Sequence, residues 1–272
     1  MSDPKDASGV IVEEEHGICT VTLARSKRGN RIDHPFLDEL KKVFLKLQDR
    51  PPRALVLTGA GPDFCSGFDL DPEGGFATRL EAGIEHGEAL ACMEFATQLR
   101  GYADMLARLP CLTIAAVEGE CHGAGLELAV ACDLRVGAEG SSYRFDHVRY
   151  GFMPCMGGVA RLLPLVGRSR AIEWVVLAPS ISAEEAEANG LIDRLVPAGE
   201  ARHAAKEMSE GVLKGEPKAI EQALMALRTL GKDCDPAALK LESECAGRTF
   251  RGGGVRPGMQ RYAKHQSKTT HT

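Results

Sequence analysis

The chain has 272 residues, of which 44% are hydrophobic, and its 33 basic and 38 acidic side chains give a net charge of −5. This is the composition of an ordinary globular protein, long enough for one sizeable core or for a core with a smaller helical appendage. It excludes extensive disorder, and it argues against a nucleic-acid partner because no broad basic field is present.

The cysteines, histidines and apolar runs exclude further classes. No two of the nine cysteines are closer than ten residues, which excludes CxxC metal or redox pairs. The eight histidines show no metal-ligand spacing, so no metal is predicted. The N-terminus is polar, and no apolar run reaches the length of a membrane span. We therefore expect a cytoplasmic protein with reduced thiols and no membrane partner.

The first hundred residues alternate between strand and helix patterns. Residues 9–24 predict two short strands joined by a tight turn, and the apolar spacing from 36 to 47 predicts an amphipathic helix. Residues 54–58 have the unbroken apolar pattern of a strand buried on both faces, which is typical of parallel sheets. Residues 88–109 again have a helical pattern.

Residues 111–133 predict a strand, a tight turn and a helix. The apolar run ends at Glu118, the turn at 122–125 is built from small residues, and the helix carries one carboxylate, Glu127. Small residues let a ligand approach the backbone closely. The first amides of a helix have no internal partner, so they can donate to an oxygen that develops negative charge.

The C-terminal half changes from mixed to helical patterns. Residues 143–147 predict an extended piece, and Ser182 with Glu185 forms a capping-box signature for a short helix. Residues 200–265 predict a run of helices. Strands interleaved with helices, followed by helices alone, predict an α/β fold: a parallel core with a helical C-terminal region.

Two glycine-bearing turns follow buried strands, at 66–69 and 123–125. If the two strands are neighbours, both turns emerge at one edge of the sheet, where α/β proteins place ligands, and their amides converge on one oxygen. Alternatively, the glycines serve only the backbone conformation of the two turns and bind no ligand. No nucleotide-binding loop or GxSxG nucleophile elbow is present.

Four stretches resemble successive motifs of the crotonase (enoyl-CoA hydratase/isomerase) superfamily, namely residues 57–70, 114–128, 151–158 and 181–191. They occur in the order typical of that family, and the resemblance runs from about residue 10 to residue 265. It implies a crotonase-type spiral of ββα repeats with a helical C-terminal trimerisation region. The chain then divides into a crotonase core domain at 1–198 and a helical region at 199–272, and a homotrimer or hexamer is expected.

The resemblance also implies an acyl thioester substrate, carried by coenzyme A or an acyl carrier. Its carbonyl oxygen accepts hydrogen bonds from the backbone N–H groups of Phe68 and Ala124. Proton abstraction, water addition and bond cleavage next to a thioester carbonyl all pass through an enolate, which preorganised amides stabilise by about 3 kcal/mol per donor. No cofactor is expected beyond the coenzyme A of the substrate.

In the hydratase pattern, two glutamates hold and deprotonate a water. Glu127 matches the first position, whereas the second falls on His147, twenty residues later. Imidazole can replace a carboxylate as a base, so this pair is expected to share a proton or to bridge a water. Alternatively, Glu127 is a structural partner of an arginine and His147 a satisfied core histidine. In an extended segment, Asp146 cannot share the face of His147.

Further residues are expected to bind the substrate. Arg25, Arg28 and Lys264 lie where the family contacts the nucleotide end of coenzyme A, with solvated surface charges as the alternative. Phe64 and Phe152 are candidates for an apolar acyl pocket, or else plain core. The remaining predicted contacts belong to the two turns: Ser66, Gly67, Asp69 and Gly123.

The leading hypothesis is an enzyme that hydrates a 2-enoyl thioester or dehydrates a 3-hydroxyacyl thioester. The same site is open to decarboxylation, a double-bond shift or hydrolysis of a carbon–carbon bond in a β-diketone. The alternative from another class is a catalytically silent subunit or acyl-CoA-binding module, against which the retained Glu127 argues. Cys155 and Met156 stand where some family members carry a nucleophilic or acidic residue, which disfavours dehalogenase and dienoyl-isomerase types.

Overall fold

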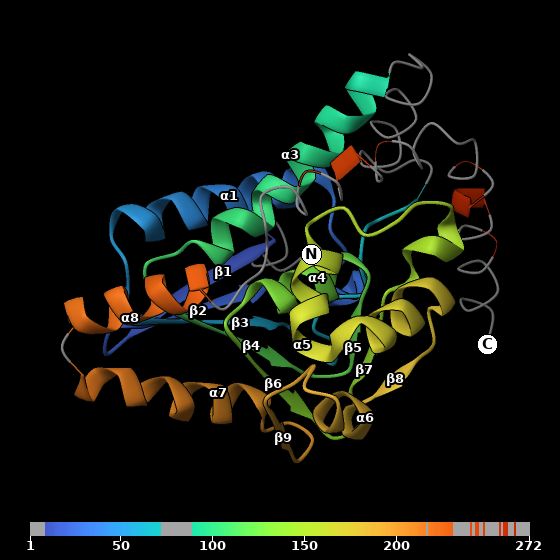
Figure 1. Ribbon diagram of the computed structural model, residues 1–272. Coiled ribbons are helices and arrows are strands. Elements are labelled where there is room, and N and C mark those ends of the chain that lie inside the picture. Colours follow the sequence, from blue (N-terminus) through green and yellow to red (C-terminus); the bar gives the residue numbers. More distant parts are fainter. Residues whose placement is uncertain are drawn as a thin grey trace, which may run out of the picture.

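The computed structural model describes residues 9–71, 89–215 and 217–230, with individual residues between 240 and 264. A six-stranded sheet of order β1-β2-β3-β4-β6-β9 lies at its centre (Figure 1). β1 and β2 are antiparallel, and the other neighbouring strands are parallel. The strands are β1 Val10–Glu15, β2 Ile18–Leu23, β3 Ala54–Gly59, β4 Leu112–Val117, β6 Leu134–Ala138 and β9 Arg194–Val196.

A second sheet of three strands continues from the ends of the central strands. It consists of β5 Glu120–His122, β7 Ser142–Arg144 and β8 Ile181–Ser182, in that order. β5 follows β4 and β7 follows β6 after short turns, so successive passes of the chain add one strand to each sheet. With the helices that follow, this is the ββα spiral that the sequence predicted.

Helices cover both faces of the central sheet, with α1 and α3 on one face and α7 on the other (Figure 1). The α-helices are α1 His34–Asp49, α3 Ala89–Ala107, α4 Ala124–Ala131, α5 Gly158–Ile172, α6 Ala183–Ala188, α7 Ala201–Glu210 and α8 Pro217–Leu230. Shorter turns are η2 Ser26–Arg28, η3 Asp146–Tyr150, η4 Glu173–Leu177 and η5 Gly211–Lys214.

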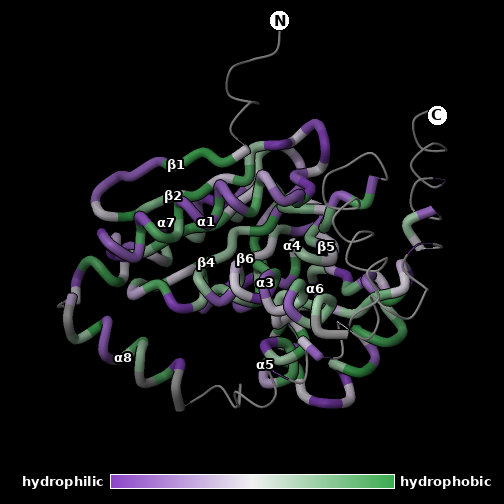
Figure 2. Tube along the Cα trace, turned by 90° about the horizontal axis from the view of Figure 1, so that it is seen from above, coloured by the Kyte–Doolittle hydropathy of each residue, from purple (hydrophilic) through white to green (hydrophobic). Residues whose placement is uncertain are grey.

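The central strands are buried on both faces, as the apolar run at 54–58 predicted. Leu55 and Leu57 of β3 belong to the core under α1 and α3, whereas Val56 packs with Ala201 and Ala205 of α7. The strands β2 and β4 are largely green in Figure 2, while α8 alternates between hydrophobic and hydrophilic residues. The helical region after residue 198 therefore begins with α7, which packs on one face of the central sheet.

The short helix α6 begins where its sequence signature predicted. The Ser182 hydroxyl oxygen accepts a hydrogen bond from the Glu185 N–H at 3.2 Å. This bond satisfies one of the first helical amides, which have no partner within the helix. The capping prediction is therefore confirmed.

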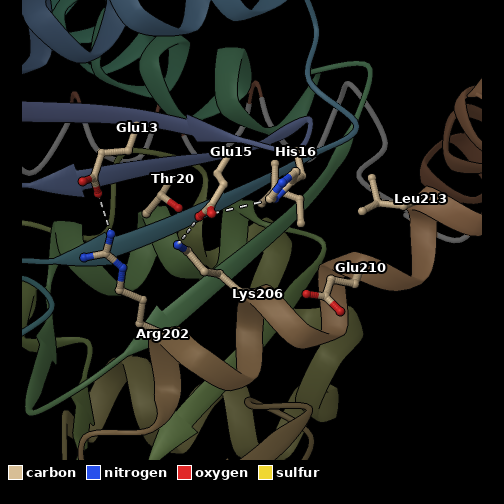
Figure 3. Close-up of a pocket in the computed structure, with 9 residues that line it drawn as sticks. Glu13, Glu15, His16, Thr20, Arg202, Lys206, Glu210 and Leu213 are labelled. Carbon is tan, nitrogen blue, oxygen red and sulfur yellow. Dashed lines mark hydrogen bonds and ion pairs between the residues drawn. The ribbon is translucent and has the colours of Figure 1, made fainter.

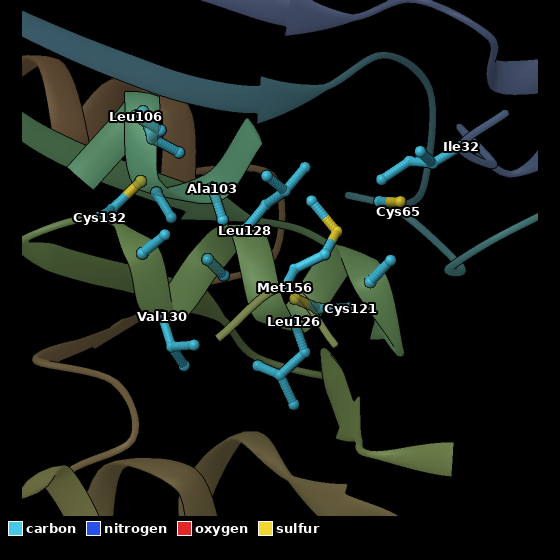
Figure 4. Close-up of a cluster of buried hydrophobic side chains, with 14 of the residues drawn as sticks. Ile32, Cys65, Ala103, Leu106, Cys121, Leu126, Leu128, Val130, Cys132 and Met156 are labelled. Atoms are coloured by element: carbon cyan, nitrogen blue, oxygen red, sulfur yellow. The ribbon is translucent and has the colours of Figure 1, made fainter. Parts of the chain in front are cut away.

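The cysteines that the structure describes are buried thiols. Cys65, Cys121 and Cys132 lie within a cluster of hydrophobic side chains (Figure 4). Burial raises the pKa of Cys65 to about 12 and that of Cys111 likewise. Thiols with such high pKa values are poor nucleophiles, so these residues act as small apolar core residues.

One partly buried arginine, Arg228, joins α8 to the sheet. Arg228 donates to Asp133 (Nε to Oδ1, 2.8 Å) and to the C=O groups of Leu109 and Cys111. Asp133 in turn accepts from the N–H and hydroxyl of Thr113, both at 2.9 Å. The two charged side chains are only 16% and 14% exposed.

Replacing this arginine is expected to destabilise the fold. Arg228→Met leaves a partly buried carboxylate and two carbonyls without their donor, so we expect a loss of about 2–4 kcal/mol in the free energy of unfolding, measured with urea. The matched control is Arg202→Met, because Arg202 pairs with Glu13 on the surface and should lose less than about 0.5 kcal/mol. Equal losses would contradict the assigned role of Arg228.

Candidate active site

The turns that follow β3 and β5 lie side by side. Cys65 forms a parallel bridge with Cys121 of β5, and the Cys65 C=O accepts from the His122 N–H at 2.9 Å. A Cβ atom on Gly67 would lie 3.8 Å from the backbone nitrogen of Ala124. The two glycine-bearing turns therefore meet at one edge of the sheet, as the sequence predicted for neighbouring strands.

The direction of the Phe68 N–H is fixed by the carbonyl that precedes it. Its preceding carbonyl, that of Gly67, accepts from the Ile32 N–H at 2.9 Å on the opposite side. A trans peptide holds its C=O and N–H in opposite directions, and the described backbone contains no cis peptide. The Phe68 N–H therefore points away from Ile32. Gly67 makes this direction possible with a φ of +101°, which side-chain-bearing residues rarely adopt.

The N–H of Ala124 points out of the N-terminus of α4. The Gly123 C=O accepts from the Glu127 N–H at 3.1 Å and so lies along the helix, which turns the Ala124 N–H outward. Gly123 has φ +50° and ψ −125°, a conformation that is strained for any residue with a Cβ. The aligned peptide dipoles of the helix add positive potential at this end.

Phe68 and Ala124 both line one narrow pocket. It is lined by Ser66, Gly67, Phe68, Leu70, Gly123, Ala124, Asp146, His147, Tyr150 and Phe152. Its volume of about 20 Å³ has room for a water-sized group. An oxygen held between the two amides therefore lies close to an imidazole and a carboxyl group, which are side chains that exchange protons.

Glu127 is fully buried behind this pocket. Its Oε1 accepts from the N–H groups of Met156 (2.7 Å) and Gly158 (3.0 Å). Its Oε2 accepts from His147 Nε2 at 3.0 Å and lies 3.4 Å from the Cys155 nitrogen. The partners of Glu127 are thus an imidazole and backbone amides rather than an arginine.

His147 links Glu127 to the pocket. Its ring is 1% exposed and makes an edge contact with Phe152, with ring centroids 5.4 Å apart. The proton on Nε2 is assigned from its carboxylate partner, which leaves the lone pair of the neutral ring on Nδ1. A Cβ on Gly123 would lie 3.9 Å from the Cε1 atom of His147. The structure shows the direct contact between the two side chains that the sharing of a proton requires.

The prediction of an extended segment over 143–147 is wrong beyond Arg144. β7 ends there, and η3 begins at Asp146. Successive side chains on a 3₁₀ turn are about 120° apart rather than on opposite faces, so Asp146 and His147 both line the pocket. The Asp146 Oδ1 would lie 3.0 Å from a Cβ on Gly123. Burial raises the pKa of Asp146, more than His147 and Arg144 lower it.

Two of the three expected basic residues, Arg25 and Arg28, lie on a separate groove of about 360 Å³, which Lys27 and Asp33 also line. Arg25 pairs with Asp33 at 2.7 Å, and Arg28 pairs with Asp69 at 2.6 Å. Asp69 is 2% exposed, so its carboxylate serves the arginine and not the pocket. Carboxylates therefore partly neutralise two of the cations expected at the substrate.

The other predicted contacts differ in their surroundings. Phe64 is fully buried in the main core, whereas Phe152 lines the pocket. Ser66 lines the pocket too, and its hydroxyl donates to the Gly29 C=O at 3.0 Å. Lys264 is an exposed helical residue.

Sequence reasoning missed Leu70 and Tyr150 as pocket residues and Met156 and Gly158 as backbone donors to Glu127. The glycine-rich turn at 151–158 was visible in the sequence. Its contact with α4 was not, because it depends on packing between segments about thirty residues apart.

A further groove of about 470 Å³ lies between the β1–β2 hairpin and α7 (Figure 3). Its charged side chains pair with one another, Arg202 with Glu13 at 2.5 Å and Lys206 with Glu15 at 3.8 Å. Within the described residues, no group of histidine, cysteine and acidic side chains is arranged to hold a metal ion. The helices in the described part of the chain are too short or too polar to cross a membrane.

The fold and the paired amides define a protein of the crotonase superfamily. A sequence model of the enoyl-CoA hydratase/isomerase family matches residues 13–270. The chain therefore belongs to this family, which confirms the resemblance seen in its motifs.

Individual relatives agree with this membership. The chain is 32% identical over 240 residues to the enoyl-CoA isomerase/hydratase fer4 of Mycosarcoma maydis, covering 84% of this chain and 83% of that protein. It is 29% identical over 251 residues to the ethylmalonyl-CoA decarboxylase of Gallus gallus, covering 89% and 79%. A solved enoyl-CoA hydratase structure from Bacillus anthracis superposes with a TM-score of 0.74 at 28% identity, covering 94% and 96%.

His122, beside the second glycine-bearing turn, makes the folding stability depend on pH. Its Nε2 lies 3.0 Å from the Ser142 hydroxyl, and burial together with Arg144 lowers its pKa to about 4. The unfolded chain takes up this proton near pH ~6.5 and the folded chain only near 4. Folding stability from this residue should therefore fall by up to about 3 kcal/mol as the pH falls through this window.

The measurement is urea unfolding of the wild type and of His122→Asn between pH 7.5 and 4.5. The variant is expected to lose less stability on acidification than the wild type, because it cannot take up this proton. Parallel curves for the two proteins would contradict the lowered pKa.

Proposed function

We propose that this protein is an enzyme that stabilises the enolate of an acyl-CoA thioester, and that its net reaction is hydration of a 2-enoyl-CoA or the reverse dehydration. The observation that carries the proposal is that the N–H groups of Phe68 and Ala124 belong to two adjoining turns that line one pocket together with His147. Family membership supplies the acyl-CoA substrate class.

The proposed chemistry follows from the negative charge that develops on the thioester oxygen during the reaction. When water adds to the β-carbon of an enoyl thioester, electron density moves onto the thioester oxygen. Two fixed N–H donors stabilise that oxygen by about 3 kcal/mol each without having to reorganise. His147, held by Glu127 through Nε2, takes the proton of the attacking water on its other nitrogen. No cofactor is needed besides the coenzyme A that the substrate carries.

Decarboxylation of a 2-carboxyacyl-CoA is the second candidate. Loss of carbon dioxide leaves the same enolate and needs a proton donor but no activated water. It is favoured by the contacts of Glu127, whose two oxygens already accept hydrogen bonds from His147 and from backbone amides. It is also supported by the similarity to ethylmalonyl-CoA decarboxylases.

The same proposal includes the contacts with coenzyme A, the oligomeric state and the cellular location. The Arg25–Arg28 loop contacts the nucleotide end of coenzyme A; an acyl-carrier thioester is the alternative. A homotrimer or hexamer is the expected assembly. A cytoplasmic location is supported by the buried cysteine thiols of the described residues.

The first experiment tests the Ala124 donor with crotonyl-CoA, by following the loss of the conjugated-enoyl absorbance. Proline is tolerated at the first position of a helix, where its ring carbon replaces the hydrogen of the N–H. Ala124→Pro therefore removes this donor and should lower kcat/KM by about 100-fold or more while the protein stays folded. The control Ala183→Pro places the same change at the first residue of α6 and should keep the wild-type rate. Equal rates for both variants would contradict the role of the Ala124 amide.

The second experiment tests His147 and the net reaction together. His147→Gln should lower kcat by about 100-fold or more and remove one limb of the pH–rate profile. Release of carbon dioxide from ethylmalonyl-CoA, measured with the same proteins, separates the two candidates. If the wild type turns over neither substrate faster than His147→Gln does, both candidate reactions are contradicted.

A further inference from the structure

The carboxyl group that lines the pocket together with Phe68 and Ala124 belongs to Asp146, not to Glu127. Asp146 lines the pocket, and its Oδ1 would lie 3.0 Å from a Cβ on Gly123, the residue before the Ala124 amide. The 3₁₀ turn η3 brings it there beside His147. Two proton-exchanging side chains, neighbours in the chain, therefore face the place where the enolate forms.

Glu127 is prevented from taking part directly. It is 0% exposed, and it is not among the residues that line the pocket. Its two oxygens accept from Met156, Gly158 and His147. A substrate proton could reach Glu127 only through the imidazole, so its geometry is that of a positioning residue for His147.

The surroundings of Asp146 suit a group that holds a proton near neutral pH. Burial disfavours its charged form, while the cationic groups around it favour that form and burial has the larger effect. Charged and titratable groups that act on it come from its own turn, from β7, from β5 and from the segment after β3. They are His147, Arg149, Tyr150, Arg144, Glu120 and Cys65.

We propose that Asp146 is a catalytic residue that gives a proton to the α-carbon of the enolate, and that Glu127 acts only through His147. The proposal rests on the enolate function above. In hydration, the water oxygen bonds to the β-carbon while its proton goes to His147, and the Asp146 carboxyl proton goes to the α-carbon. The imidazolium then returns a proton to the Asp146 carboxylate directly or through solvent, so one water is added in each cycle.

The variants are Asp146→Asn, which keeps the size of the side chain but has no acidic proton, and Glu127→Gln. The control Asp193→Asn makes the same change at a residue that pairs with Arg135 away from the pocket. The readouts are kcat and KM on crotonyl-CoA across pH, exchange of the α-protons of butyryl-CoA in heavy water, and the urea midpoint of each protein.

Asp146→Asn should lower kcat and α-proton exchange by about 100-fold, with KM within about threefold of wild type, and should abolish the pH limb in which activity falls at high pH. Glu127→Gln should slow turnover yet keep that limb. Asp193→Asn should stay within about twofold of wild type. If Asp146→Asn unfolds, Asp146→Ser provides the same test.

Two results would overturn the assignment. If Asp146→Asn keeps both limbs and at least a third of the wild-type kcat, Asp146 is not the donor, and the enolate function stands. If the wild type neither hydrates crotonyl-CoA, decarboxylates ethylmalonyl-CoA nor exchanges α-protons, the enolate function fails and the role of Asp146 fails with it.

Discussion

The buried carboxylate of Glu127 joins two segments that line the pocket, α4 and η3, to the turn at 155–158. It belongs to α4, whose first residue carries the Ala124 amide, and it accepts from His147 of η3 and from backbone amides at 156 and 158. Because an uncompensated buried charge costs several kcal/mol, these partners have little freedom to move away. The position of the imidazole relative to the amides is therefore set by the same interaction that stabilises this part of the fold.

The geometry of the amides has a different origin. The Phe68 N–H is directed by the hydrogen bond that the Gly67 carbonyl makes to Ile32, and the Ala124 N–H by the first bond of α4. Both are consequences of planar trans peptides whose carbonyl oxygens are held by backbone hydrogen bonds. Side chains tune the pocket around these donors, but they do not create them.

Much of this arrangement could be predicted from the sequence. Three features depend on local sequence signals: the apolar run at 54–58, the turn at 122–125 and the cap at Ser182. In each case the structure has the element that the local sequence predicts. The resemblance identified His147 by counting from Glu127. The position of Asp146 in the pocket was missed because alternation predicts a strand through 147, whereas β7 ends at Arg144 and a 3₁₀ turn begins at Asp146. The donors to Glu127 come from residues 28 to 31 positions away, which no local pattern reports.

The backbone origin of the Phe68 donor has a consequence for how such a protein diversifies. A substitution at position 68 changes the shape of the pocket without removing the N–H, unless the new residue is proline. Under the proposed function, the fold preserves the donors to the oxyanion, while single side-chain substitutions change which acyl group fits the pocket. Two relatives can therefore bind different acyl groups and still form the enolate at the same two backbone N–H groups.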